Sequence, residues 1–314
     1  MTSSAIAATG LRKAFGDKVV LDGIDLDVRA GTVFSLLGPN GAGKTTTVNV
    51  LTTLTRADGG TVRVAGHDVA TETREVRKAI GVTGQFAAVD ELLTGRENLQ
   101  LMADLHRLGP AEGRQAVAEL LERFDLVESA QKLAATYSGG MRRKLDLAMT
   151  LVGSPRIIFL DEPTTGLDPR SRRTMWEIIR QLVADGVTIF LTTQYLDEAD
   201  RLSDRIAVLD QGRLVAQGTP HDLKRQIPGS HVRFRFADAA VLDAATRVLA
   251  GSTSDAEDLT LRVPSDGGAK SVRTLLETLE KHSIEVEEFS VHTPDLDDVF
   301  LALTGRTSTE EKAR

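Results

Sequence analysis

Residues 38–46 read G-P-N-G-A-G-K-T-T, and the apolar run V-F-S-L-L at 33–37 precedes them directly. The segment contains the pattern G-x-x-x-x-G-K-[ST], in which a strand enters a glycine-rich turn and a helix begins after it. Glycine lacks a Cβ, so this backbone can wrap its N–H groups around an anion, and the lysine adds a positive charge. The stretch therefore predicts a phosphate site made by Gly38, Pro39, Asn40, Gly41, Ala42, Gly43, Lys44, Thr45 and Thr46.

The residues after this turn predict how a phosphate and a metal would be held. Apolar positions recur at Val48, Leu51 and Leu54, so a helix is expected and the phosphates would lie at its positive end. The Thr45 hydroxyl is the expected ligand of Mg²⁺. The alternative interpretation, a glycine-rich surface loop, requires the complete pattern to have arisen by chance.

The composition of the chain limits the classes of protein to which it can belong. Its 314 residues predict one large domain and a smaller one. The net charge of -7, with acidic and basic residues interleaved, argues against a nucleic-acid partner. The absence of cysteine excludes disulfides, thiolate metal sites and cysteine nucleophiles. The first ten residues lack a secretory pattern, and the aliphatic runs are far shorter than the roughly 20 residues needed to span a bilayer. Any role at a membrane therefore needs a partner.

The periodicity of the apolar residues predicts the organisation of the first domain, at 1–225. Alternation over 6–28 and again over 61–69 indicates antiparallel strands with one buried face. Helical spacing dominates 97–151, so a helical subdomain is expected at about 91–153.

Short, continuously apolar runs predict a parallel sheet in the same domain. The run R-I-I-F-L at 156–160 is typical of a strand covered on both faces. Runs at 80–83, 187–191 and 206–209 alternate with helical stretches. Strands that alternate with helices in this way indicate an α/β domain.

A change of composition at 226–230 (Q-I-P-G-S) predicts a linker to a small α+β domain at 231–305. Its expected strands lie at 231–236, 259–263 and 284–289, and its expected helices at 241–249 and 272–279. A last helix places Leu296, Val299, Phe300 and Leu303 on one face and stops at Gly305. The polar tail at 306–314 is predicted to be disordered.

The acidic pair Asp161 and Glu162 follows the buried strand at 156–160. Open α/β sheets bind ligands at the carboxyl ends of their strands, so both side chains are expected near the phosphate site. Asp161 is positioned to hold Mg²⁺ through water, and Glu162 is the candidate base that polarises an attacking water. An acidic pair after a strand can also be purely structural, but its occurrence together with the glycine-rich turn favours the catalytic interpretation.

Residues 137–141 read Y-S-G-G-M, which resembles the signature motif (usually L-S-G-G-Q) of the ATP-binding cassette (ABC) ATPases. The resemblance covers 5–225 with all motifs in order. It implies an ABC-type P-loop ATPase domain with a mixed-sheet core, an antiparallel β subdomain and a helical subdomain. It also implies a homodimer that sandwiches ATP head to tail, so that the signature of one copy faces the phosphates bound by the other. The residues carried over are Ser138, Gly139, Gly140 and Met141; the alternative for this segment is an ordinary helix N-terminus.

The same resemblance assigns roles to three further residues. Phe15 matches the aromatic position that stacks on adenine, with a core phenylalanine as the alternative. Gln85 matches the glutamine that contacts Mg²⁺ or the lytic water and reports the nucleotide state to the membrane subunit. Asp168, in T-G-L-D at 165–168, matches the position that couples the two active sites. It can also cap the helix that begins near Pro169, and the two roles are compatible.

One position departs from the family pattern. After the strand at 187–191 most ABC ATPases place a histidine against the γ-phosphate, whereas this chain has Gln194. An amide can donate a hydrogen bond but cannot become cationic near neutral pH, as imidazole can. We expect Gln194 to contact the γ-phosphate, with consequences for turnover and phosphate sensing. The implied catalytic residues are Glu162, Gln194, Lys44 and Gln85, and the implied metal ligands are Thr45, Gln85 and Asp161.

Four segments narrow the resemblance to the daunorubicin-resistance type of ATP-binding protein. They are D-E-L-L-T-G-R-E-N-L at 90–99, T-Y-S-G-G-M-R-R-K-L-D-L-A at 136–148, T-T-Q-Y-L-D-E-A-D at 192–200 and L-D-D-V-F-L-A-L-T-G at 296–305. This resemblance implies an ATPase that uses ATP and Mg²⁺ at the cytoplasmic face of the cell membrane. It would power export of a drug or hydrophobic natural product through a separate permease. Export of a lipid or polysaccharide is the nearer alternative, and a soluble ABC ATPase acting on nucleic acid or ribosomes is the more distant one.

Three groups of residues also have structural interpretations. The face formed by Leu296, Val299, Phe300 and Leu303 is either part of the core of the small domain or a surface that pairs two C-terminal domains. Arg142, Arg143 and Lys144 are expected on a solvated helix face, with a contact to a phosphate or to the permease as the alternative. Asp197, Glu198 and Asp200 are expected at solvated positions of a short helix.

Overall fold

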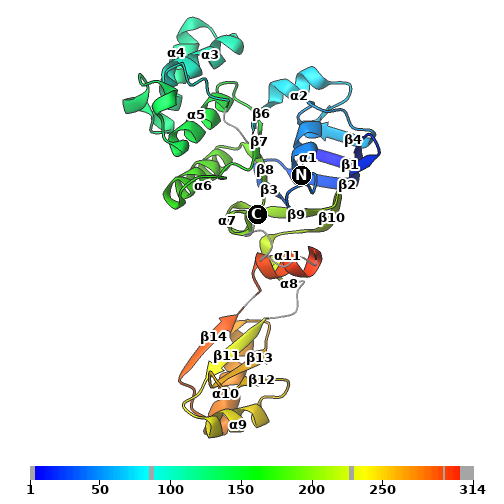
Figure 1. The fold of residues 1–314 in the computed structure, drawn as a ribbon, viewed down its shortest axis with the longest axis vertical. Coiled ribbons are helices and arrows are strands. Elements are labelled where there is room, and N and C mark those ends of the chain that lie inside the picture. Colours follow the sequence, from blue (N-terminus) through cyan, green and yellow to red (C-terminus); the bar gives the residue numbers. More distant parts are fainter. Residues whose placement is uncertain (1–3, 85–87, 226–229, 293, 305–314) are drawn as a thin grey trace. The chain divides into compact units, whose positions relative to one another are not determined.

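The computed structural model describes residues 4–84, 88–225, 230–292 and 294–304. Its contacts divide the chain into two compact units, and the division falls between Pro220 and His221. In the described residues, the first unit contains two sheets and the C-terminal unit contains one (Figure 1). Each unit has hydrophobic clusters of its own.

A six-stranded sheet of order β10-β9-β3-β8-β7-β6 forms the centre of the first unit (Figure 1). Its strands are β3 (Val33–Leu37), β6 (Ile80–Thr83), β7 (Ile157–Asp161), β8 (Thr188–Thr193), β9 (Arg205–Asp210) and β10 (Arg213–Gly218). All neighbouring strands are parallel except β9 and β10. Every residue of β3, β7 and β8 is buried, as their apolar sequences require. The predicted mixed-sheet core is confirmed.

The antiparallel β subdomain is a second sheet, of order β2-β1-β4-β5. It contains β1 (Ser4–Phe15), β2 (Lys18–Arg29), β4 (Gly59–Val64) and β5 (His67–Asp68). Leu21 and Ile24 of β2 belong to one buried cluster with Phe34 of β3 and with Val48 and Leu51 of α1 (Lys44–Leu51). This cluster fixes the first helix, which follows the glycine-rich turn, against the central sheet. A short helix, α2 (Thr73–Ala79), connects the subdomain to β6.

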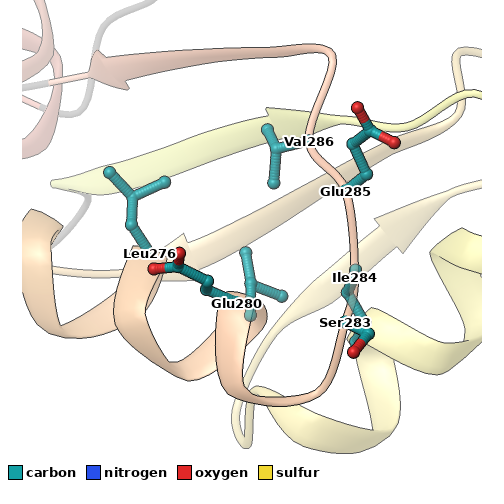
Figure 2. Close-up of a pocket in the computed structure, with 7 residues that line it drawn as sticks. Leu276, Glu280, Ser283, Ile284, Glu285 and Val286 are labelled. Atoms are coloured by element: carbon teal, nitrogen blue, oxygen red, sulfur yellow. The ribbon is translucent and has the colours of Figure 1, made fainter.

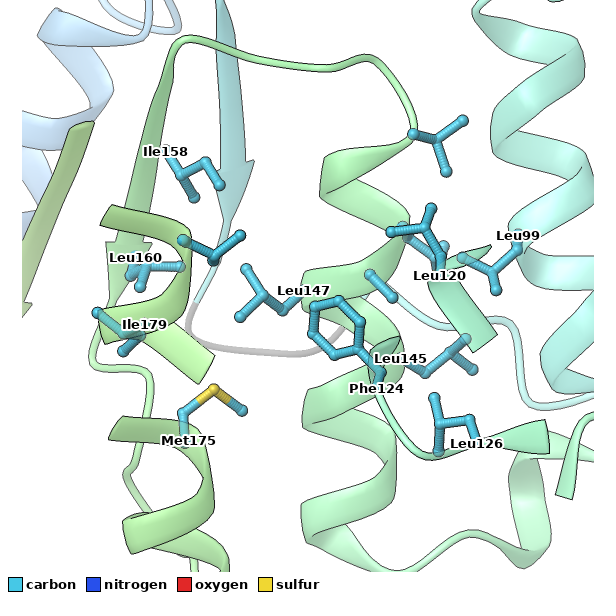
Figure 3. Close-up of a cluster of buried hydrophobic side chains, with 14 of the residues drawn as sticks. Leu99, Leu120, Phe124, Leu126, Leu145, Leu147, Ile158, Leu160, Met175 and Ile179 are labelled. Atoms are coloured by element: carbon cyan, nitrogen blue, oxygen red, sulfur yellow. The ribbon is translucent and has the colours of Figure 1, made fainter. Parts of the chain in front are cut away.

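The helical subdomain consists of α3 (Gly95–Leu105), α4 (Pro110–Arg123) and α5 (Gly139–Leu151), with 3-10 turns at Val127–Ser129 and Ala134–Thr136. Thr94 and Glu97 form a reciprocal capping box at the start of α3. Figure 3 shows the cluster in which Phe124 and Leu147 from this subdomain join Leu160 of β7 and residues of α6 (Pro169–Ala184). Because one core links these elements, α5 has a fixed place beside β7.

The remaining elements are α7 (Leu196–Leu202), which follows β8, and those of the C-terminal part of the chain. The latter are α8 (Pro220–Arg225), β11 (His231–Arg235), α9 (Ala239–Val248), β12 (Thr253–Asp255), β13 (Thr260–Pro264), α10 (Ala269–Lys281), β14 (Glu288–His292) and α11 (Leu296–Thr304). The sheet has the order β12-β13-β11-β14 and only antiparallel pairs. Its core includes Phe234 of β11, Leu242 of α9 and Leu279 of α10. The predicted α+β fold is confirmed.

One strand of this domain begins later than predicted. We expected a strand at 284–289, but β14 begins at Glu288 and pairs with β11 along its whole length. Ser283 has a φ of 56°, so the chain turns sharply after α10. Ile284 is then buried in the core and Val286 packs against it. These apolar residues belong to a packed connection, which has the same sequence appearance as the start of a strand.

Some predictions for the C-terminal region lie partly outside the described residues. The parts that are not described are the tail at 306–314, most of the predicted linker (226–229) and the side chain of Leu303. Within the described part of α11, Leu296 and Val299 are buried and Phe300 is half-buried.

Candidate functional site

The strand register places three predicted segments at one edge of the central sheet. Asp161 at the end of β7 is opposite Thr192 of β8, and Leu37 at the end of β3 is opposite Thr193. The amide of Gly38 donates to Thr193 O at 3.4 Å. The glycine-rich loop, the acidic pair and Gln194 therefore all follow strands that end side by side.

The loop at 38–46 requires glycine at specific positions. Gly43 is the N-cap of α1 with a φ of 112°, and a Cβ there would lie 2.7 Å from Leu21 Cδ2. A Cβ on Gly38 would lie 2.3 Å from Leu209 O. Among the described contacts, no side chain caps α1, and its first turn contains no acidic residue. Its first amides can therefore serve an anion.

Lys44 lies between the loop and the acidic pair. Its Nζ donates to Gly38 O at 2.6 Å and to Pro39 O at 3.3 Å, and it lies 3.4 Å from Glu162 Oε1. The side chains of Lys44 and Glu162 are only 5% and 10% exposed. A charge-assisted pair at this burial brings the candidate base into the phosphate loop.

Two side chains whose oxygens could bind a divalent cation, Thr45 and Asp161, lie together beside this pair. Thr45 Oγ1 donates to Asp161 Oδ2 at 3.0 Å, and Thr192 Oγ1 donates to Asp161 Oδ1 at 2.5 Å. Hydroxyl and carboxylate oxygens are the ligands that Mg²⁺ prefers, usually with phosphate oxygens and water in the remaining positions. The donor set therefore fits Mg²⁺. Gln85, the third predicted metal ligand, lies outside the described residues.

Gln194 directly follows β8 and is half-buried. Thr193 Oγ1 accepts a hydrogen bond from Tyr195 N at 2.9 Å, which fixes the backbone around the glutamine. Its position after Thr193 places it at the same sheet edge as Glu162. A contact with the γ-phosphate remains a prediction.

The signature segment is held differently from the phosphate loop. Ser138 is the N-cap of α5, and its Oγ accepts from Met141 N at 3.2 Å. Ser138 and Gly139 are exposed. A Cβ on Gly140 would lie 2.6 Å from Ser171 Oγ, so glycine allows α5 to approach α6 at this point. The helix-cap interpretation is thus present in the structure and leaves the Ser138 hydroxyl hydrogen available to donate.

Asp168 is the N-cap of α6, as its structural interpretation predicted. It accepts from Arg170 N at 2.9 Å, from Ser171 N at 3.0 Å and from Ser171 Oγ at 2.5 Å. The hydrogen bonds from the Ser171 side chain and amide lower the pKa of Asp168. Because Ser171 also contacts Gly140, the two segments assigned to the dimer interface are neighbours on one surface.

Phe15 is 54% exposed, so the alternative of a core phenylalanine is wrong. The Lys13 ammonium lies 5.1 Å from the centre of the ring. An exposed aromatic face on β1 is available to stack on a base.

Two residues that we expected at solvated positions are buried. Arg143 is 7% exposed, because its guanidinium donates to main-chain carbonyls that include Pro163 O at 3.0 Å, whereas Arg142 and Lys144 are half-buried. Glu198 is 1% exposed, and its Oε1 accepts from Thr164 Oγ1 and Trp176 Nε1 at 2.8 and 3.1 Å. Burial raises the pKa of Glu198.

Helical spacing carried a signal for both residues. Glu198 lies four positions before Leu202 on the buried side of α7, and Arg143 lies four positions before Leu147 of α5. Because both side chains are charged, we expected them in solvent although their spacing places them with buried residues.

A cavity of about 420 Å³ lies in the C-terminal unit, and none of the predicted site residues lines it. Figure 2 shows it between the end of α10 and the segment that leads to β14. Its lining residues are Leu276, Leu279, Glu280, Ser283, Ile284, Glu285 and Val286. Two glutamates and no basic residue make this cavity unsuited to a nucleotide phosphate.

Among the described helices, none has the length and apolar character that a membrane span requires.

Two family models match the chain. The ABC transporter family matches residues 21–165, and the ATP-binding protein DrrA1-3-like, C-terminal domain matches residues 218–304. Among solved structures, one described as the ATP-binding subunit of an ABC transporter has a TM-score of 0.64 and 29% identity, and covers 71% of this chain and 93% of that chain. An ATP-binding cassette in a dimeric post-hydrolysis state, bound to ADP and Pi, has a TM-score of 0.62 and 25% identity, with 68% and 98% covered.

Curated relatives match over nearly their whole length. The daunorubicin resistance ATP-binding protein DrrA2 of Streptomyces coeruleorubidus is 47% identical over 100% of this chain and 99% of its own. The daunorubicin/doxorubicin resistance ATP-binding protein DrrA of Streptomyces peucetius is 49% identical, with 98% and 96% covered. The Nod factor export ATP-binding protein I of Ralstonia nicotianae is 39% identical, with 96% and 94% covered. The chain therefore belongs to the ABC transporter family, as an ATPase subunit of the DrrA-like group.

Proposed function

We propose that this chain binds Mg²⁺ and ATP between two copies of itself and hydrolyses the ATP to power export of a drug or hydrophobic natural product through a separate permease. The observation that carries the proposal is the convergence of Lys44, Thr45, Asp161 and Glu162 at one sheet edge. The dimer would act at the cytoplasmic face of the cell membrane.

The residues at this edge have complementary roles in phosphoryl transfer to water. Lys44 and the first amides of α1 balance the negative charge of the phosphates. Mg²⁺ bound by Thr45 and Asp161 would supply further charge neutralisation at the phosphate oxygens. Glu162 takes a proton from the attacking water as the bond to the leaving ADP breaks. Stabilisation of charge is the main contribution to the rate.

The ion pair between Lys44 and Glu162 suggests how the base is controlled. When no phosphate competes for the ammonium, the Lys44 ammonium pairs with the Glu162 carboxylate at 3.4 Å. A γ-phosphate attracts Lys44 more strongly than one carboxylate does, because it has a larger negative charge. Glu162 is then released to accept a proton from water.

The surface that contains Ser138 and Asp168 supports the second copy in the proposal. Both residues are exposed and lie at the N-termini of neighbouring helices, where donors point outward. Such a surface contributes to a nucleotide site only when a second copy of the chain brings its bound nucleotide against it. The similar cassette in a dimeric state with ADP and Pi supports the same arrangement.

The nature of the cargo is inferred from the relatives. Two proteins that are named for daunorubicin resistance match over the whole chain at 47% and 49% identity. A relative named for Nod factor export is less similar, at 39%. These values favour a drug or drug-like product, with a glycan or lipid product as the second candidate.

The test uses the chain in complex with its permease in lipid vesicles. Addition of daunorubicin is expected to increase the ATPase rate, and Glu162→Gln is expected to abolish the basal and stimulated rates while ATP still binds. An unchanged rate with daunorubicin and a rise with a lipid-linked saccharide would favour the second candidate. Hydrolysis at the wild-type rate by Glu162→Gln would refute the assignment of the base.

A further inference from the structure

The Arg143 guanidinium of α5 binds the main chain on both sides of Glu162. Its Nε donates to Pro163 O at 3.0 Å, and its Nη2 donates to Asp161 O at 3.2 Å. Its Nη1 donates to Gly84 O at 2.7 Å, directly after β6. One side chain of the signature helix therefore joins two segments that leave the central sheet at the same edge.

Asp146, one turn further along α5, completes this arrangement. Its Oδ2 lies 3.3 Å from Arg143 Nη1, and its Oδ1 accepts from Ala88 N at 2.9 Å. The two side chains are 9% and 4% exposed. The pair thus binds Gly84 and Ala88, which are the described residues on either side of 85–87.

Stability alone does not account for a buried ion pair of this kind. Desolvation costs several kcal/mol per ion, and apolar residues in the same place are often as stable or more stable. Burial lowers the pKa of Arg143 and raises the pKa of Asp146, which is the direction expected when desolvation disfavours each charged form. The hydrogen bonds to four backbone groups offset part of this cost.

The backbone that the pair supports is unusual. Glu162 has a φ of 49°, a left-handed conformation that few residues other than glycine adopt. Such a conformation persists when the surrounding contacts determine it. Glu162 N donates to Thr192 O at 3.1 Å, and Arg143 holds the carbonyls of Asp161 and Pro163.

We propose that Arg143, held by Asp146, is a positioning residue that fixes the backbone of Glu162 for hydrolysis and links it to the helix that begins at Ser138. This inference rests on the proposed role of Glu162 as the base. In the proposed dimer, Ser138 faces the nucleotide of the partner copy, whereas Glu162 serves the nucleotide of its own chain. Arg143 therefore couples the nucleotide site of the partner copy, to which Ser138 contributes, to the nucleotide site of its own chain, which contains Glu162.

The experiment compares Arg143→Met, Arg143→Lys and Asp146→Asn in the full-length chain with Mg²⁺ and ATP. Lys144→Met is the matched control, because Lys144 is on the same helix and its ion pair, to Asp125 at 3.8 Å, joins a partner that is 98% exposed. The readouts are kcat, the Kd of a fluorescent ATP analogue and the melting temperature.

We expect Arg143→Met to lower kcat about 10- to 100-fold, because small displacements of a catalytic group have effects of this size. The Kd should stay at the wild-type value, since the hydrogen bonds described for Arg143 are to Gly84, Asp161, Pro163 and Asp146 and not to the phosphate loop. Arg143→Lys should recover part of kcat, because an ammonium can donate to some of the same carbonyls. Lys144→Met should change neither value.

Two results would overturn the inference. One is a wild-type kcat in Arg143→Met and Asp146→Asn. The other is a fall in kcat that is matched by weaker nucleotide binding and a lower melting temperature in every variant, which indicates a purely structural role. If Arg143→Met does not fold, the volume-conserving Asp146→Asn and the conservative Arg143→Lys decide between these results and the expected one.

Glu162→Gln, measured in parallel, separates this inference from the proposed function. If Glu162→Gln hydrolyses ATP normally, the assignment of the base fails. If Glu162→Gln is inactive and the variants of Arg143 and Asp146 keep the wild-type kcat, only the present inference fails.

Discussion

The phosphate loop and the signature segment belong to the same unit, but the chain supports them in different ways. Lys44 and Asp161 are 5% and 6% exposed and are bonded to the loop, to Thr45 and to Glu162. Ser138 is exposed, and its side chain accepts a hydrogen bond from Met141 N of its own helix. The phosphate-loop half of the site can bind a nucleotide with groups that are already in place. The signature half, which contains Ser138, needs a nucleotide that another copy brings to it. Substitutions in the two halves should therefore have different consequences.

Lys44→Ala should have the largest effect. Loss of a buried charge that contacts a charged ligand costs about 2–5 kcal/mol of binding, so both ATP affinity and hydrolysis should be lost. Titration with a fluorescent ATP analogue measures the affinity, and the exposed Lys132→Ala is the control. Wild-type affinity in Lys44→Ala would show that the buried half does not bind the phosphates.

Ser138→Arg should abolish hydrolysis and leave ATP binding intact. The larger side chain blocks the approach of a second nucleotide, and loss of a transition-state donor alone lowers kcat about 10²- to 10³-fold. Steady-state ATPase assays and nucleotide titration test this separation, with Thr136→Arg, at another exposed position of the chain, as control. If Ser138→Arg also fails to bind ATP, the two halves are not independent.

Gln194→Ala should reduce kcat by about tenfold, which corresponds to the loss of one hydrogen bond to a charged group. Gln194→His should introduce a new pH dependence near the usual pKa of imidazole, about 6.5. Rate profiles between acidic and neutral pH measure both effects. An unchanged kcat in Gln194→Ala would remove this residue from the γ-phosphate.

Phe15→Ala should have the smallest effect, because the ring is 54% exposed and would contribute one stacking contact with the base. Loss of one aromatic contact costs about 0.5–1.5 kcal/mol, so the Kd for ATP should rise by a few-fold. Calorimetric titration with ATP, and with inorganic tripolyphosphate as a ligand without adenine, isolates the contribution of the base. Equal weakening for both ligands would contradict a stacking role.

Much of this architecture could be predicted from local patterns. Continuously apolar runs identified β7 and β8, and the motif at 38–46 identified the strand, turn and helix that carry Lys44. These features depend on neighbouring residues in the sequence, so periodicity and spacing were sufficient to find them. The exposure of Phe15 was left open because one aromatic residue in an alternating strand can face either side.

The contacts of Arg143 could not be predicted in the same way. Its partners Pro163 and Gly84 are 20 and 59 positions away in the sequence. Main-chain carbonyls have no sequence signature, and three consecutive basic residues are typical of a solvated face. The start of β14 was misjudged for a related reason, because the burial of Ile284 depends on the packing of α10 and not on the pairing of a strand.

The most direct test of the account is the molar mass of Glu162→Gln in solution, measured by light scattering with ATP and Mg²⁺ and again with ADP and Mg²⁺. We predict a dimer with ATP, a monomer with ADP, and a monomer with ATP when Ser138→Arg is added to the same chain. A Glu162→Gln protein that stays monomeric with saturating ATP would contradict the proposal that two copies complete the site.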